Sequence, residues 1–197
     1  MSSLARPRFT LEEYLALERR ADHKSEFLGG EIFAMAGASF RHNVLVANIM
    51  RELGARLRQG SCLPVASDQR VQVKPTGLNT YPDVVVVCGE PEFTDDRLDT
   101  LTNPTVLVEA LSESTETYDR GEKFAHSRRI ESLSDYVLVS QDKMRVEHYV
   151  RQGERWVLSE FNAPQGHIAL SSVGCELSIT EVYAHRDFAE PAASQIT

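Results

Sequence analysis

Cysteine is scarce in this sequence. The 197 residues include three cysteines, Cys62, Cys88 and Cys175, which lie far apart and form no C-x-x-C pair. This usage excludes a disulfide-rich scaffold and a C-x-x-C metal or redox site. We therefore expect all three thiols to be reduced and buried.

Long hydrophobic runs are absent as well. The longest apolar stretches, such as Val84–Cys88 and Val106–Val108, fall far short of the roughly 20 residues needed to cross a bilayer. The N-terminus has two arginines but no apolar segment before Glu12 and Glu13, so it lacks the pattern of a secretory signal. We expect a cytoplasmic protein with no membrane partner.

Positive charge is in deficit, because 21 lysines and arginines stand against 29 aspartates and glutamates and leave a net charge of −8. Non-specific binding of nucleic acid relies on clustered Lys and Arg that neutralise phosphates. The charge therefore excludes a protein that binds nucleic acid over a large basic surface. Any nucleic acid must be held locally or with help from another molecule.

What the sequence does contain is the composition of a folded domain, with 42% hydrophobic and 25% charged residues. A length of 197 residues suits one domain. We predict a single α/β domain over residues 1–187, followed by a flexible C-terminal tail at residues 188–197.

Hydrophobic periodicity predicts the order of the elements. A helix begins after Thr10, whose hydroxyl and Glu13 form a capping-box pattern, and Gly29-Gly30 is typical of a hairpin turn between Ser25–Leu28 and Glu31–Met35. The core then reads helix, strand, strand, strand, helix, strand over Ser39–Leu57, Cys62–Val73, Tyr81–Cys88, Thr105–Leu111, Tyr118–Leu133 and Asp135–Ser140. Antiparallel strands are predicted to follow at Arg145–Val150, Trp156–Phe161, His167–Leu170 and Glu176–Ile179.

Two carboxylates stand in apolar strand segments. Asp83 opens the run Val84–Cys88, and Glu109 interrupts Thr105–Leu111. Burying an unpaired carboxylate costs several kcal/mol, so such a group must be neutralised, paired or bound to a cation. If these strands pair, Asp83 and Glu109 meet at one rim, where a hard cation such as Mg²⁺ or Mn²⁺ fits. The alternatives are a surface strand-start position for Asp83 and a purely structural ion pair for Glu109.

Lys123 follows Asp119 by four residues on the helix predicted after the Glu109 strand. The short connection returns the Lys123 ammonium toward the strand rim. Two carboxylates, a divalent cation and a lysine suit hydrolysis of a phosphodiester, with the lysine orienting the nucleophile or neutralising phosphate charge. The alternative is a solvated lysine that supports Asp119 through an i,i+4 pair.

Other polar residues are weaker candidates. Glu26 and Glu31 lie on opposite strands of the hairpin and are candidates for an extra acid over the metal, or for the polar face of an exposed ribbon. His42, at the start of the long helix, is a candidate for phosphate contact or proton transfer, or a structural histidine. Asp68 is a candidate for a further metal ligand. Arg120, Lys123, Arg128 and Arg129 give one helix a basic edge, which is a candidate phosphate track but which we interpret as a solvated helix face. The residues interpreted as structural are His126, His148, His167, His185, Tyr149 and Trp156.

Several of these residues also form a recognisable pattern. The motifs are Pro82-Asp83, Glu109 in an apolar strand followed by Leu111-Ser-Glu-Ser-Thr115, Asp119-x3-Lys123, Glu26-Phe-Leu-Gly-Gly-Glu31, Met35-Ala-Gly-Ala-Ser39 with His42, and Asp135-Tyr-Val-Leu-Val139. Together they resemble the Uma2 (DUF820) family within the PD-(D/E)XK nuclease superfamily. The resemblance covers roughly Phe9 to Tyr183.

This resemblance implies a restriction-endonuclease-like core with an added N-terminal hairpin and C-terminal antiparallel strands. It implies a homodimeric endonuclease that depends on Mg²⁺ or Mn²⁺ and takes nucleic acid, with DNA the expected form, as a transient substrate. Asp83, Glu109 and the Ala110 carbonyl would hold the metal, and Lys123 would position the attacking water. Glu26, Glu31, His42 and Asp119 would be auxiliary residues.

The sequence departs from the family pattern at two positions. Leu111 occupies the place, two residues after Glu109, where the superfamily pattern has lysine, so that role would pass to Lys123. Glu113 stands where Uma2 members commonly carry proline and adds negative charge near the site. Two other functions remain open: a catalytically inactive nuclease-fold domain that binds a partner or nucleic acid, and a homo-oligomeric structural protein whose acidic pocket is an ion-pair network.

Overall fold

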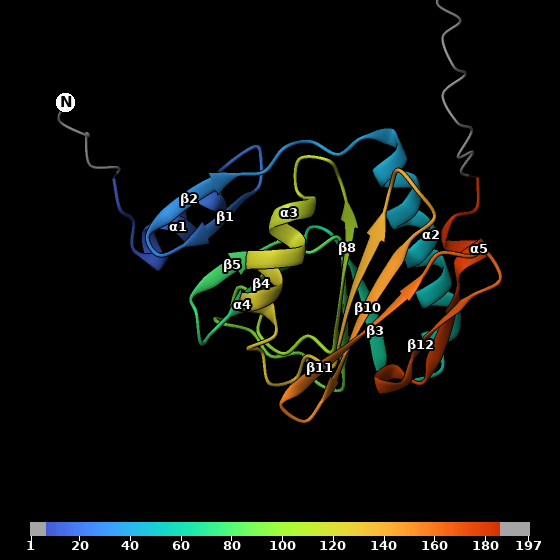
Figure 1. The fold of residues 1–197 in the computed structure, drawn as a ribbon. Coiled ribbons are helices and arrows are strands. Elements are labelled where there is room, and N and C mark those ends of the chain that lie inside the picture. The colour runs from blue at the N-terminus through green and yellow to red at the C-terminus, as the bar shows by residue number, and fades with distance from the viewer. Residues whose placement is uncertain (1–6, 186–197) are drawn as a thin grey trace, which may run out of the picture.

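Three β-sheets, of six, five and two strands, form within residues 7–185, the part of the chain that the computed structural model describes (Figure 1). The six-stranded sheet has the order β11-β10-β9-β8-β6-β3. Its strands are β3 (Cys62–Ala66), β6 (Val84–Cys88), β8 (Val106–Leu111), β9 (Asp135–Ser140), β10 (Val146–Gln152) and β11 (Arg155–Phe161). The tail predicted at residues 188–197 lies outside the described residues.

The five-stranded sheet has the order β2-β1-β5-β4-β7, and β12 pairs with β13. These strands are β1 (Ser25–Leu28), β2 (Glu31–Ala34), β4 (Arg70–Val73), β5 (Leu78–Thr80), β7 (Thr100–Leu101), β12 (His167–Leu170) and β13 (Cys175–Ser178). The helices are α1 (Leu11–Glu18), α2 (Phe40–Leu57), α3 (Glu116–Tyr118), the π-helix η1 (Asp119–Lys123), α4 (Phe124–Ser127), the 3₁₀-helix η2 (Ser171–Val173) and α5 (Ile179–Val182).

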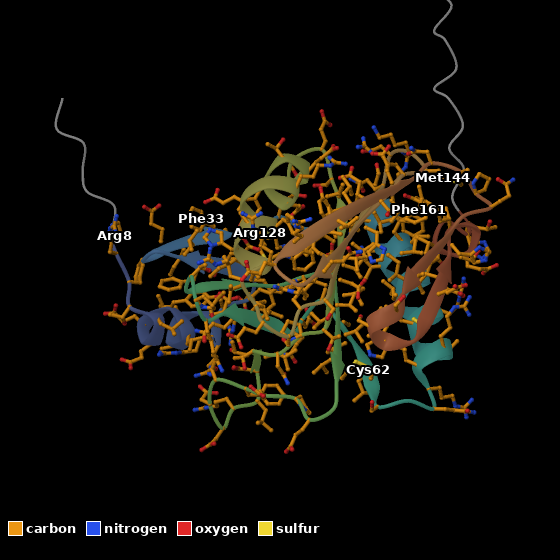
Figure 2. All side chains as sticks on the ribbon, turned by 60° about the horizontal axis from the view of Figure 1, so that its bottom comes forward. Arg8, Phe33, Cys62, Arg128, Met144 and Phe161 are labelled. Atoms are coloured by element: carbon orange, nitrogen blue, oxygen red, sulfur yellow. A yellow bond between two sulfur atoms is a disulfide. The ribbon has the colours of Figure 1, made fainter. Side chains whose placement is uncertain are left out.

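Helix α2 covers one face of the six-stranded sheet, while α3, η1 and α4 lie on the other (Figure 1). Strand β8 is buried along its whole length, as expected for a strand covered on both faces. On the α2 side, Leu45, Ile49 and Leu53 pack in a cluster with residues of β6 and β8, and Met144 and Phe161 cover its edge (Figure 2). The opposite face packs Val85, Val87, Leu107 and Leu111 with Phe124 and Tyr136.

The predicted core order is confirmed, with differences at the boundaries. The segment Cys62–Val73, predicted as one strand, is two strands in different sheets, because a turn with a hydrogen bond from Gln69 N to Ala66 O separates β3 from β4. Strand β6 begins at Val84, two residues after Pro82, which has no N–H for a strand ladder.

The prediction of a helix over Tyr118–Leu133 was wrong about where the helix ends, because α4 stops at Ser127. The Arg151 guanidinium explains the stop. It donates to the carbonyls of Arg128, Ile130 and Leu133 at 2.8, 2.6 and 2.6 Å, and so satisfies backbone groups that a continuing helix would have paired internally.

The expectation of three reduced cysteines was wrong for two of them. Cys62 and Cys88 lie directly opposite each other in the antiparallel pair of β3 and β6 and form a disulfide. Cys62 is labelled in Figure 2. Their separation of 26 residues conceals this proximity, which arises from strand pairing. Cys175 is a free, buried cysteine, as predicted.

Within residues 7–185, no helix has the length and apolar character required to cross a membrane.

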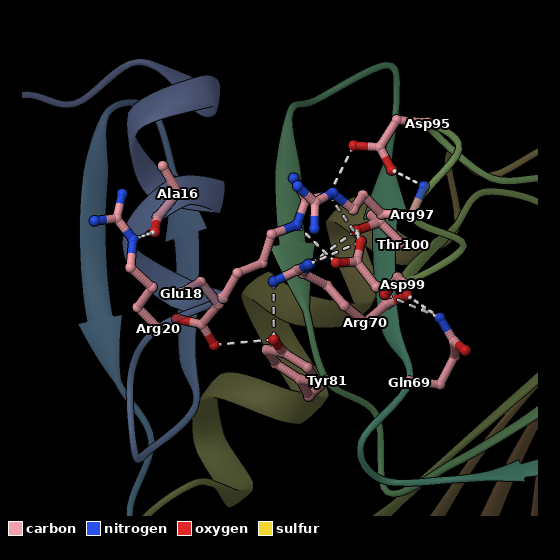
Figure 3. Close-up of polar contacts among 11 residues, drawn as sticks. Ala16, Glu18, Arg20, Gln69, Arg70, Tyr81, Asp95, Arg97, Asp99 and Thr100 are labelled. Carbon is pink, nitrogen blue, oxygen red and sulfur yellow. Dashed lines mark hydrogen bonds and ion pairs between the residues drawn. The ribbon is translucent and has the colours of Figure 1, made fainter.

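The N-terminal helix is tied to the five-stranded sheet by charged groups (Figure 3). Arg19, which follows α1, pairs with Asp95 and Asp99, each at 2.7 Å. Asp99 also pairs at 3.1 Å with Arg70, which is buried in β4. The hydrogen bond from Arg19 holds the pKa of Asp99 well below its ordinary value.

We expect Asp99→Asn to lower the free energy of unfolding by about 1 kcal/mol at neutral pH, since partly exposed ion pairs contribute modestly. A carboxyl whose pKa is lowered by folding stabilises the protein above its unfolded pKa and loses that effect as pH falls toward the folded pKa. The difference between wild type and variant should therefore shrink below about pH 4. Urea unfolding at pH 7 and at progressively lower pH measures it, and a pH-independent difference would contradict the prediction.

Candidate active site and metal centre

Asp83 and Glu109 come together at the end of the β6–β8 pair. In this antiparallel pair Val84 lies opposite Val108, and one further step in the same register sets Asp83 opposite Glu109. Opposite residues share a face of the sheet. Asp83 Oδ2 also accepts a 2.7 Å hydrogen bond from the Ala110 N–H, so the Asp83 side chain reaches across to β8.

Lys123 of η1 completes the cluster. Its buried ammonium lies 2.9 Å from Glu109 Oε1, 3.5 Å from Glu26 Oε1 and 3.7 Å from Asp119 Oδ1. The solvated-lysine alternative was therefore wrong for Lys123. Three buried carboxylates surround one ammonium.

Glu26 is held at this cluster by two hydroxyls. The Thr80 hydroxyl donates to Glu26 Oε1, and the Tyr118 hydroxyl donates to Oε2 at 2.8 Å. Glu26 is buried, so the exposed-ribbon interpretation was wrong for it. Glu31, the first residue of β2, lies opposite Leu28 beside the hairpin turn.

His42 approaches Asp83 from the first turn of α2. Its Nε2 lies 3.1 Å from Asp83 Oδ2, and this hydrogen bond raises the pKa of His42 against the opposing effect of burial. Ser39 caps the helix by accepting from the His42 N–H, and its hydroxyl donates at 2.9 Å to Gln141 beyond β9. The start of α2 is thus fixed to both the site and the six-stranded sheet.

The π-helix η1 is the local feature that sequence periodicity did not predict. It carries both Asp119 and Lys123. Short π-helical segments are rare overall, but where they occur they are often found at functional sites. Arg120, between them, pairs with Glu147 of β10 at 2.7 Å and with Glu116. The Tyr136 hydroxyl donates to the Asp119 carbonyl at 3.2 Å. These contacts anchor the turn to the sheet.

Burial controls the charge states of this cluster. It raises the pKa of Glu109 well above its ordinary value, although the Lys123 ammonium offsets part of the rise. Burial alone would lower the pKa of Lys123, but Glu109, Glu26 and Asp119 outweigh it and hold that pKa well above normal. Lys123 is therefore an ammonium at neutral pH.

The carboxylates at the β6–β8 end, Asp83 and Glu109, are the type of oxygen donor that a hard divalent cation takes. Glu109 Oε1 is buried and lies 2.9 Å from the Lys123 ammonium. A strand residue presents its N–H and its carbonyl to the same side, so the Ala110 carbonyl faces Asp83. Residues 7–185 contain no group of three or more His, Cys, Asp or Glu side chains arranged for a metal. The donor set is two carboxylates and a carbonyl, which suits Mg²⁺ because that ion keeps several waters and binds phosphate.

The structure shows where the two residues that depart from the family pattern, Leu111 and Glu113, lie. Leu111 is buried on the Glu109 face and packs in the apolar cluster with Phe124, so a lysine there would lie in the core. Lys123 brings an ammonium to Glu109 from a separate segment instead. Glu113 is exposed in the loop after β8.

Several other residues singled out from the sequence lie away from the Lys123 cluster. Asp68 is exposed and pairs with Lys24 at 3.1 Å, and His148 is buried against Asp135 at 2.6 Å. Tyr149 and Trp156 pack on Phe124, as the structural interpretation predicted. Sequence reasoning missed Thr80, Tyr118 and Tyr136, because no sequence pattern indicates that their hydroxyls reach the cluster.

The buried ion pair can be tested without assuming any activity. Lys123→Met should destabilise the protein by about 3–5 kcal/mol, because it leaves carboxylates buried without their ammonium. Adding Glu109→Gln should recover part of that loss, since one buried charge is removed with its partner. Urea denaturation of the wild type, both single variants and the double variant gives the coupling energy. Strictly additive losses would contradict a direct pair.

The chain is similar to several known proteins. The model of the Uma2 family, described as "Putative restriction endonuclease", matches residues 11–180. The uncharacterized protein sll1609 of Synechocystis sp. is 39% identical over 163 residues, which are 82% of this chain and 92% of the relative. The uncharacterized protein slr1290 of the same organism is 34% identical over 178 residues, which are 90% of this chain and 92% of the relative.

A solved structure shares the fold. It is the crystal structure of a protein from Anabaena variabilis described as a putative nuclease belonging to DUF820, with a TM-score of 0.74 at 18% identity. The match covers 89% of this chain and 97% of that chain. The core is therefore restriction-endonuclease-like, as the resemblance implied. Because the family model spans most of the sequence and both relatives exceed 30% identity, the chain belongs to the Uma2 family.

Proposed function

We propose that this protein is a divalent-metal-dependent endonuclease that hydrolyses nucleic-acid phosphodiesters, with DNA as the expected substrate. The observation that carries the proposal is the buried Glu109–Lys123 pair at 2.9 Å, beside an Asp83 carboxylate that reaches the same strand. The nuclease descriptions of the family and of the Anabaena variabilis structure support the same chemistry.

Asp83, Glu109 and the Ala110 carbonyl would hold Mg²⁺ or Mn²⁺. Both hydrogen bonds that fix Asp83 within the described residues end on Oδ2, which leaves Oδ1 to face a cation. When bound, such an ion polarises the phosphate and lowers the pKa of a coordinated water. His42 and the Ala110 N–H keep the Asp83 carboxylate in one orientation.

Lys123 is the proposed cationic group of the reaction. Its ammonium donates to the attacking water or to a phosphate oxygen and stabilises the negative charge that develops in the transition state. Glu26 and Asp119 hold the ammonium at the site. The Tyr118 and Thr80 hydroxyls in turn fix Glu26.

Homodimer formation stays a prediction. Strand β11 forms one edge of the six-stranded sheet, and its Val157 and Leu158 are exposed. Edge strands with exposed apolar side chains are prone to pair with another chain. A second copy placed about a two-fold axis is the partner we propose for this edge.

Metal binding is expected to stabilise the wild type. A ligand that binds only the folded state at 100 times its dissociation constant adds about 2.7 kcal/mol, so Mn²⁺ should raise the midpoint of thermal unfolding. Asp83→Asn and Glu109→Gln should abolish the shift because each removes a charged donor. Asp68→Asn, which removes an exposed carboxylate paired with Lys24, should retain it. Equal shifts in all four proteins, or none in the wild type, would refute this cation site.

Cleavage of plasmid and single-stranded DNA with Mg²⁺ or Mn²⁺ tests the activity. Asp83→Asn should lower the rate at least about 100-fold, and Lys123→Met by a similar factor if circular dichroism shows that it folds. Asp68→Asn should cleave like the wild type. Metal binding without cleavage of either DNA or RNA would favour the inactive binding domain. Absence of any cation effect would favour the structural ion-pair network.

A further inference from the structure

Glu18, the last residue of α1, is a buried carboxylate outside the proposed catalytic cluster. Its Oε1 accepts hydrogen bonds from the Ser25 N–H and from the Tyr81 hydroxyl, both at 2.9 Å. Its Oε2 accepts the Ser25 hydroxyl. One side chain therefore binds two separate segments of the chain.

Both segments lead directly to site residues. Ser25 immediately precedes Glu26, which contacts Lys123, and Tyr81 lies two residues before Asp83. Figure 3 shows Glu18 facing Tyr81, whose hydroxyl also accepts from buried Arg70 at 3.0 Å. Glu18 thus links the two strand ends that carry Glu26 and Asp83.

The backbone alone gives the hairpin a weak attachment at this point. Strand β1 pairs with β5 through one registered residue pair, Phe27 with Asn79. Side-chain contacts therefore contribute to how the β1–β2 hairpin sits on the sheet. Glu18 is suited to this because a carboxylate accepts charge-assisted hydrogen bonds, which are stronger than neutral ones.

We propose that Glu18 is a positioning residue of the active site, which places Glu26 against Lys123 and Asp83 against Ala110. This inference rests on the proposed nuclease function. Glu18 contacts neither substrate nor metal in this scheme and acts through Ser25 and Tyr81. A small displacement of a catalytic group can cost about 100-fold in rate, so loosening this link should slow the reaction without abolishing the fold.

The test compares Glu18→Gln with Arg19→Gln. Glutamine keeps the shape of Glu18 but loses the charge and the second acceptor oxygen that binds the Ser25 hydroxyl. Arg19 is the next residue and pairs with Asp95 and Asp99, and those pairs involve neither Ser25 nor Tyr81. Arg19→Gln is therefore the matched control, which alters stability through the same helix end.

Glu18→Gln should lower kcat roughly tenfold or more with little change in KM, while Arg19→Gln keeps kcat. In a double variant with Glu26→Gln, the loss should be smaller than the sum of the two single losses, because part of the Glu18 effect acts through Glu26. Tyr81→Phe, a second way to break the link, should lower kcat in the same direction. Equal effects of Glu18→Gln and Arg19→Gln on kcat, or additive losses with Glu26→Gln, would overturn the proposal.

Hydrogen exchange separates this inference from the nuclease function. The Ala110 amide donates to Asp83 Oδ2, so its exchange rate reports where Asp83 lies. The exchange rate of the Ala110 amide, taken relative to that of the core amide of Val137, should rise in Glu18→Gln and stay unchanged in Arg19→Gln. If the wild type cleaves nothing, the nuclease function fails, and this exchange ratio alone decides whether Glu18 positions Asp83. An unchanged ratio in Glu18→Gln would refute the positioning role.

Discussion

The ammonium of Lys123, buried among Glu109, Glu26 and Asp119, is the interaction on which the rest of the site depends. Burying these charges is costly, and only close geometry and further hydrogen bonds offset that cost. The π-turn, the hairpin and the end of β8 all contribute groups to this one arrangement. The fold therefore brings parts of the chain that are distant in sequence close enough for the Lys123 ammonium to pair with these carboxylates.

Much of the fold could be predicted because local patterns determine it. Strand β9 was predicted with its observed bounds, since Asp135–Ser140 is a short apolar run between turns, and the α1 capping box was predicted from Thr10 and Glu13. The Cys62–Cys88 disulfide and the split of Cys62–Val73 between two sheets depend on strand pairing. No local pattern encodes that pairing.

The same distinction applies to the site. Asp83 and Glu109 stand out because each interrupts or opens an apolar strand, and Lys123 stands out by its spacing from Asp119. The hydroxyls of Thr80, Tyr118 and Tyr136, and the carboxylate of Glu18, are ordinary in sequence and become informative only through their contacts. Leu111 illustrates the opposite case, because its burial explains why the site takes its lysine from a separate helix.

We propose that Asp83, Glu109 and the Ala110 carbonyl hold one divalent cation beside Lys123. The most direct test is a crystal structure after soaking with Mn²⁺, with anomalous differences used to locate the ion. A peak within about 2.0–2.4 Å of oxygens from Asp83, Glu109 and Ala110 is the predicted result. No peak at these oxygens, with Mn²⁺ bound elsewhere or nowhere in the crystal, would contradict the claim.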